Sequence, residues 1–219
     1  MATTRRLVKD PVSGFSHLAG LGVALVGSGW LLGRTSTGTC GGALVALVVY
    51  AVSLVTLYMS SSLYHLLPVG EALARRLRTV DHVAIFLFVA GTCTPVFHHA
   101  LSGTARAVML SAIWGVAVLG VVFKLLWLSA PRALYTIFYV AMGWAVVLQW
   151  NRVVAALPHV TFALIVAGGV IYTLGAVVYV ARRPDPYPKV FGFHEIWHLF
   201  VLAGSTLHFL AIATLPSLQ

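Results

Sequence analysis

Charged side chains are scarce in this sequence. Only 9% of its 219 residues are Asp, Glu, Lys or Arg, whereas 60% are apolar and the mean hydropathy is +0.95. A soluble domain carries roughly a quarter of its residues as charges, and a chain with so few cannot cover itself with a water-compatible surface. The composition therefore excludes a soluble protein and predicts an integral membrane protein.

Cysteine is almost absent as well. Cys40 falls in an expected loop and Cys93 midway along an apolar stretch. Because these positions lie at different depths, we predict free thiols rather than a disulfide, and two cysteines form no metal-binding pattern. Linkers rich in proline or serine and internal repeats are also lacking, so we expect one domain spanning residues 1–219.

Long apolar stretches are plentiful, and seven of them can cross about 30 Å of hydrocarbon as helices of about 20 residues. They cover approximately residues 15–33, 42–67, 82–101, 107–128, 133–150, 159–181 and 191–215. The predicted fold class is all-α, a bundle of seven transmembrane helices whose first stretch is a retained signal anchor. Close helix packing is expected at Gly29 and Gly33 of the first stretch and at Gly168, Gly169 and Gly175 of the sixth.

Basic residues gather on one side of the expected membrane. That side holds Arg5, Arg6, Lys9, Arg75, Arg76, Arg78, Lys124, Arg132, Arg182, Arg183 and Lys189, against Arg34, Arg106 and Arg152 on the other. This bias predicts a cytoplasmic N-terminus and an external C-terminus in a cell membrane, a bacterial inner membrane. The net charge of +9 then reflects orientation, and no nucleic-acid partner is expected because such binding needs a solvated basic face. Lys124, near a helix end, is expected to reach lipid phosphates.

Titratable side chains from four of the stretches converge at the cytoplasmic depth. The group contains Asp10, Glu71, Asp81, Asp185 and Glu195 together with His17, His65, His82, His194 and His198. Ionisable residues within a membrane are costly, so such a group marks a functional site by default. The sequence leaves the roles of three of them open: Glu195 could support a ligand, and His17 and His82 lie at the depth at which they could touch the site.

Two histidines of the last stretch form the best metal-binding pattern. His194 and His198 are four residues apart, so they share one helical face and can hold one metal ion. A zinc site needs a third ligand, and His65 at the inner end of the second stretch is the best donor by depth. Ser61, one turn earlier, could hydrogen-bond a water at the metal, and Asp81 could orient that water or take its proton.

Each of these residues also has a structural reading. Asp81 could cap the third helix, and Ser61 could be a helix-packing hydroxyl. The letters HEIWH match the H-E-x-x-H of zinc proteases, in which Glu195 would be the general base. In a protease of this kind the third zinc ligand would have to come from a residue earlier in the sequence than the motif. His208 lies about 15 Å beyond His198 along the helix, too far to join the same metal.

Three segments together carry a family resemblance. The chain contains SSSLYH, DHVAIFLFVAGTCTP and HEIWHLFVLAGSTLHF, with further matches at SHLAG and YVAMGW. In these segments it resembles the hemolysin III branch of the progestin and adipoQ receptor family. The resemblance implies seven helices and a zinc ion held by His65, His194 and His198, with Ser61 and Asp81 beside a water at the metal. Gly14 departs from the pattern, because a polar residue, often Asn, is expected before His17.

Four functions follow as hypotheses. The first is a zinc-dependent hydrolase acting on an amide or ester of a membrane lipid, as the ceramide-cleaving relatives of the family suggest. The alternative is a non-enzymatic sensor or regulator of the membrane with a structural zinc. An intramembrane protease with the H-E-x-x-H motif is less favoured. A cytolysin is also disfavoured, because a pore-forming toxin should have a soluble or amphipathic form able to insert.

Overall fold

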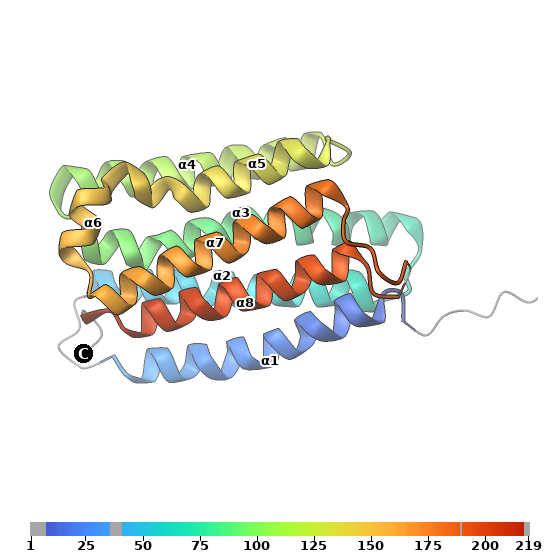
Figure 1. Ribbon diagram of the computed structural model, residues 1–219, viewed down its shortest axis with the longest axis horizontal. Coiled ribbons are helices and arrows are strands. Elements are labelled where there is room, and N and C mark those ends of the chain that lie inside the picture. Colours follow the sequence, from blue (N-terminus) through green and yellow to red (C-terminus); the bar gives the residue numbers. More distant parts are fainter. Residues whose placement is uncertain (1–7, 36–40, 189, 217–219) are drawn as a thin grey trace, which may run out of the picture.

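The computed structural model describes residues 8–35, 41–188 and 190–216, which are almost entirely helical (Figure 1). Within these ranges, seven spans are long and apolar enough to cross a membrane. They are α1 (Pro11–Gly33), α2 (Gly41–Leu66), α3 (Glu71–Ala100), α4 (Gly103–Leu126), the fifth span (Arg132–Ala156), α7 (His159–Ala181) and α8 (Phe193–Ala213). The all-α, seven-helix fold class is confirmed. Arg5, Arg6, Cys40 and Lys189 lie outside the described residues.

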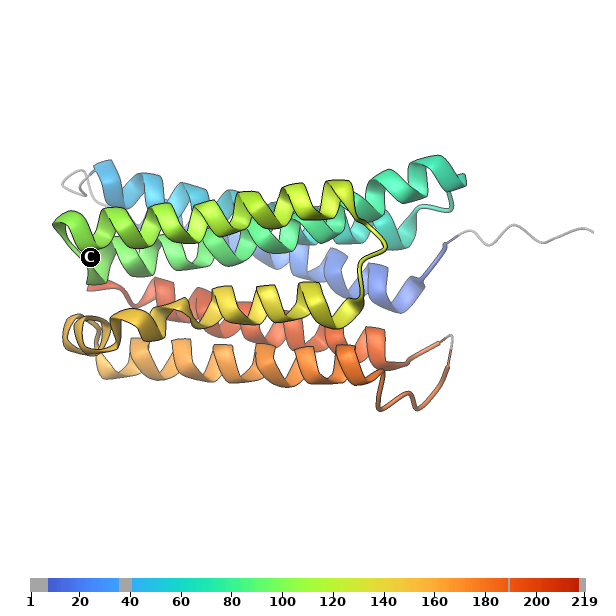
Figure 2. The ribbon, with the colours of Figure 1, turned by 90° about the horizontal axis from the view of Figure 1, so that it is seen from above.

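Helix α3 is the centre of the bundle. About two thirds of its apolar window is buried (67%), against 28% for α4. Figure 1 shows α4 and α5 at one edge and α1 at the other, with α2, α3, α7 and α8 between them. In the turned view of Figure 2, α2, α3 and α4 lie on one side and α5, α7 and α8 on the other. Large apolar side chains such as Val26, Leu119 and Leu126 are exposed on the outside of the bundle. Such exposure is expected when the solvent is lipid and not water.

Two predicted boundaries are wrong. Helix α3 begins at Glu71, not near residue 82. Hydropathy locates only the apolar part of a helix. The polar run EALARRLR consists of good helix formers, so it extends α3 beyond that apolar part. Asp81 therefore lies well inside α3 and does not cap it. The fifth span is not one helix over 133–150: α5 (Arg132–Gly143) passes into a 3₁₀ segment, η1 (Trp144–Gln149), and then α6 (Trp150–Ala156).

The expected glycine packing is correct for α7 and wrong for α1. A Cβ atom at Gly175 would lie 2.6 Å from Cβ of Phe200 on α8, and one at Gly168 would meet the ring of His208. No atom of the described residues lies within 4 Å of the Cβ position at Gly29 or Gly33. Close approach of helices through small residues is therefore used between α7 and α8.

A matched pair of alanine substitutions should separate these two kinds of glycine. Gly175→Ala should destabilise the protein by about 1–3 kcal/mol, because the new methyl group overpacks the α7–α8 contact. Gly29→Ala should be neutral or stabilising by up to about 1 kcal/mol, since alanine is the better helix former. Unfolding in detergent checks both variants, and equal effects would contradict the packing assignment.

Lys124 does not reach outwards as expected. Its side chain is fully buried, its Nζ atom lies 3.5 Å from the centroid of the Tyr135 ring, and it donates a 3.4 Å hydrogen bond to the carbonyl oxygen of Leu128. A cation over an aromatic face retains electrostatic stabilisation away from water. Lys124 thus joins the end of α4 to the start of α5.

Candidate metal centre

Three histidines meet at the end of the bundle where α2 ends and α8 begins. His65 lies in the last turn of α2, and His194 and His198 lie in the first two turns of α8. The Nε2 atoms of His65 and His194 are 3.4 Å apart, and one ligand atom of each residue lies within 4.8 Å of the others. Zinc binds imidazole nitrogen at about 2.0–2.1 Å. The sequence-based trio is therefore close enough to share one ion after small side-chain rotations.

The hydrogen bonding of the trio suits a metal ligand set. Nδ1 of His65 lies 3.1 Å from Oδ2 of Asp10, and a carboxylate only accepts, so Nδ1 carries the proton and Nε2 keeps a free lone pair. Nδ1 of His198 is buried with no hydrogen-bond partner among the described residues. A buried polar atom without a partner is costly and calls for a ligand or an ion. These residues fit a divalent cation that prefers nitrogen donors.

Asp10 supports His65 from outside the helices. Its backbone N–H also donates to the carbonyl oxygen of His65 at 2.8 Å. The hydrogen bond from His65 holds the pKa of the Asp10 carboxyl below its ordinary value, and Lys9 acts in the same direction while partial burial opposes it. A carboxylate behind a ligating histidine fixes the ring and raises its basicity. Sequence reasoning placed Asp10 at this depth and missed its pairing with His65.

Neutralising Asp10 should weaken the metal site without emptying it. Asp10→Asn removes the charge behind His65, so the affinity of the three-histidine cluster for added zinc should fall by about 10- to 100-fold. Competition with a chelator in detergent measures the affinity. Glu71→Gln, an exposed carboxyl at the start of α3, is the control and should leave it unchanged. An Asp10→Asn affinity equal to wild type would show that the contact is incidental.

Glu195 is engaged away from the histidines. Its Oε1 atom accepts a 2.8 Å hydrogen bond from Ser13 of α1, and its Oε2 atom accepts one of 2.8 Å from the backbone N–H of Gly192. The second contact closes the N-terminus of α8. Glu195 also does not line the cavity described below. These contacts describe a helix cap that ties α8 to α1, not a base directed at a substrate.

His17 of α1 enters the centre, whereas the sequence left its role open. Its Nδ1 atom forms a 2.8 Å hydrogen bond with Oγ of Ser61, and its ring stacks on His198 with centroids 3.8 Å apart. Its Nε2 atom is buried and has no hydrogen-bond partner in the ranges that the structure describes. Glycine fits at position 14 because a Cβ atom there would collide with the side chain of Leu66. The departure from the family pattern at Gly14 thus leaves His17 in place.

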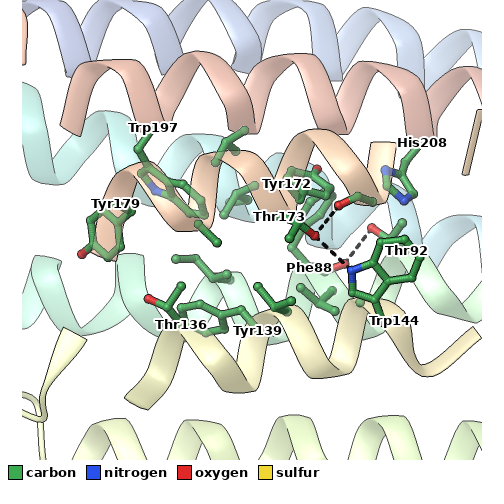
Figure 3. Close-up of a pocket in the computed structure, with 18 of the residues that line it drawn as sticks. Phe88, Thr92, Thr136, Tyr139, Trp144, Tyr172, Thr173, Tyr179, Trp197 and His208 are labelled. Carbon is green, nitrogen blue, oxygen red and sulfur yellow. Dashed lines mark hydrogen bonds between the residues drawn. The ribbon is translucent and has the colours of Figure 1, made fainter. Parts of the chain in front are cut away.

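An elongated cavity of about 120 Å³ adjoins the histidines and runs between the two sides of the bundle. At the end beside the histidine cluster its wall includes His17, Ser61, Asp81, His194 and His198. The middle is mostly aliphatic and aromatic, and Figure 3 shows Tyr139 of α5 and Trp197 of α8 around it. Ser61 and Asp81 thus line the same cavity as His194 and His198, two of the predicted ligands. The third predicted ligand, His65, does not line the cavity. His82 also lines the cavity and packs edge-on against Tyr135.

Fold and site together define a class: seven-helix membrane proteins with a histidine cluster at one end of the bundle. A family model described as Haemolysin-III related matches residues 5–209. The chain is 32% identical to Hemolysin-3 homolog of Bacillus subtilis (77% of this chain, 76% of the relative) and 34% identical to Hemolysin-3 of Bacillus cereus (78% and 74%). It is 28% identical to human Monocyte to macrophage differentiation factor (75% and 67%). The chain belongs to the haemolysin-III related family, which confirms the resemblance to the progestin and adipoQ receptor proteins.

Proposed function

We propose that the protein is a zinc-dependent hydrolase that cleaves an amide or ester bond of a membrane lipid. The observation that carries this proposal is that the cluster of His65, His194 and His198 adjoins one end of a cavity whose wall there also holds the Asp81 carboxyl and the Ser61 hydroxyl, and whose middle is mostly aliphatic and aromatic. Neutral imidazoles favour zinc among the common metals of hydrolases. An apolar cavity that ends in a few convergent polar groups is the usual form of a site for an amphiphilic small molecule.

In this proposal the site faces the cytoplasm, and the distribution of basic residues supports that orientation. Arg75, Arg76 and Arg78 at the start of α3, and Arg182 and Arg183 after α7, flank the end of the bundle that holds the histidines. Basic residues concentrate on the cytoplasmic side of membrane proteins. The scissile linkage of the lipid then lies near the headgroup boundary of the inner leaflet, with its chain inside the cavity.

Zinc bound to the three histidines would polarise the lipid carbonyl and make water acidic enough to attack near neutral pH. Asp81 is the proposed base: its carboxylate takes a proton from the attacking water and passes it to the leaving nitrogen or oxygen as the carbon–nitrogen or carbon–oxygen bond breaks. Ser61, held by His17 at 2.8 Å, orients that water. The apolar wall excludes bulk water and strengthens these interactions.

Purified protein tests the proposal directly. Zinc-loaded and chelator-treated protein would be offered a panel of lipid amides and esters, with the released acid measured by mass spectrometry. We expect zinc-dependent release from at least one class. If no member of a broad panel is cleaved, the hydrolase proposal fails.

A second function has an observation in its favour. The histidine cluster joins the end of α2 to the start of α8, segments that are 129 residues apart in sequence at the His65–His194 contact. A metal there would fasten the bundle in a sensor or regulator of the membrane, with no turnover. In that case metal removal would lower stability sharply, because binding energy becomes folding energy.

A further inference from the structure

The cavity runs parallel to the helices, and α3, α7 and α8 line it over similar lengths. Its lining residues extend from Ile165 to Tyr179 on α7, from His194 to His208 on α8 and from Asp81 to Phe97 on α3. At 1.5 Å per residue, these stretches are about 21 Å long on α7 and α8 and about 24 Å long on α3. Three helices thus agree on a depth of about 21 Å, measured from the end beside the histidine cluster.

The wall between the two ends offers mostly carbon to a ligand. The threonines that line it in the described structure, Thr92, Thr136 and Thr173, each donate their hydroxyl proton to a carbonyl oxygen of their own helix. Trp144 Nε1 is engaged as well, because it donates to Thr173 Oγ1 at 3.0 Å (Figure 3). A polar chain would lose its hydrogen bonds to water here without replacement, so this stretch fits a hydrocarbon chain.

The end of the cavity remote from the histidines is closed by the apolar core. Val96 of α3 and Ile165 of α7 line this end and are buried in one core cluster, and Val146 of η1 also lines it and packs against the same cluster. Leu157, after α6, and Leu215, after α8, belong to that cluster and fill the bundle beyond this wall. A chain that enters beside the histidines therefore meets a packed wall.

The depth of the cavity sets the length of the chain that fills it. An extended chain advances about 1.2 Å per bond, as the backbone of an extended peptide does with its three bonds per residue. A depth of about 21 Å therefore corresponds to about 17 bonds, an acyl chain of about 16–18 carbons. The fifth span gives a similar depth, because α-helical and 3₁₀ rise from Tyr135 to Val146 add up to about 18 Å.

We propose that Val96, Val146 and Ile165 form a chain-length stop, so that the favoured ligand is a lipid with an extended acyl chain of about 16–18 carbons. This inference rests on the proposed function only for the polar end of the ligand, which lies at the histidine cluster. It adds a specificity for the other end: longer chains are rejected, because their last methylene groups would overpack the wall.

The test measures the binding of saturated fatty acids, from decanoic to tetracosanoic acid, to the purified protein with added zinc in detergent. At each length the affinity of a variant is divided by that of wild type, because this ratio cancels the partitioning of the acid into micelles. Val146→Phe fills the far end, so the ratio for octadecanoic acid should fall about tenfold. Decanoic acid does not reach the wall, so its ratio should stay at one.

Ile165→Ala should have the opposite effect. It removes three carbon atoms from the wall, so the ratio for eicosanoic acid should rise about fourfold for each methylene group that gains a place. Decanoic acid should again be unaffected. Val147→Phe, at the exposed next position of η1, is the matched control for Val146→Phe and should keep a ratio of one at every length.

The outcomes separate this inference from the proposed function. Ratios that do not depend on chain length in Ile165→Ala overturn the chain-length stop even if lipid amides are hydrolysed, and so does failure of every fatty acid to bind. Val146→Phe also enlarges a side chain in the core, so Ile165→Ala decides the question if the first variant loses affinity at all lengths. Length-dependent ratios with no hydrolysis of any lipid overturn the enzyme and not the stop.

Discussion

Replacing His198 with alanine is expected to yield a purified protein without bound zinc and with less than about 1% of any lipid-hydrolysing activity. The reason is that in the proposed zinc site three imidazoles are the full set of protein ligands, and a zinc site with an open position needs all three. Loss of a supporting partner alone costs about 10- to 100-fold in metal affinity, and loss of a ligand should cost more. Metal content by mass spectrometry and turnover on the same sample measure both effects.

The same variant discriminates the enzyme from the metal-fastened sensor. His198 is buried and stacks on His17, so its removal also creates a small cavity. If the variant keeps a melting temperature close to that of wild type while activity disappears, the metal is catalytic. If it unfolds or loses most of its thermal stability, the metal is structural. His159→Ala, at the exposed start of α7, is the matched control and should change neither property.

Asp81→Asn is the variant with the second largest expected effect. The amide cannot accept a proton from water, and general-base catalysis contributes about 10²–10⁴-fold, so kcat should fall by about 100-fold or more. Asp81 is not one of the proposed zinc ligands, so the zinc content should stay at the wild-type value. A loss of zinc together with activity would instead make Asp81 a ligand or a structural support.

The control for Asp81 lies on the same helix. Glu71→Gln removes an exposed carboxyl at the start of α3 and should leave kcat and zinc content unchanged. Ser61→Ala should lower kcat less than Asp81→Asn, because the hydroxyl orients the water but does not take its proton. If Asp81→Asn keeps full activity, the base must be sought elsewhere in the cavity wall.

The depth of the site residues in the membrane was predictable from the sequence because hydrocarbon excludes polar groups so strongly. Charged and titratable groups avoid hydrocarbon, so the apolar runs locate the seven spans, and the shared depth of His65, His194 and Asp81 follows from where those runs end. The four-residue spacing of His194 and His198 fixes their common face. Depth and spacing together therefore predict that the three histidines meet at one place.

Rotation of each helix about its axis was not predictable in the same way. It depends on packing against several neighbours, and hydropathy does not record it. For that reason the stacking of His17 on His198, the pairing of Asp10 with His65 and the burial of Lys124 were all missed. The cavity was missed too, because its wall is assembled from side chains of six of the seven spans.

X-ray absorption spectroscopy at the zinc edge of the purified protein tests the central claim most directly. The account predicts about one zinc ion per chain with three nitrogen neighbours at about 2.0–2.1 Å and an oxygen atom as the fourth neighbour. It also predicts loss of the signal when His65 is replaced by alanine. A zinc-free protein, or a zinc ion whose surroundings do not change in the His65→Ala variant, would contradict it.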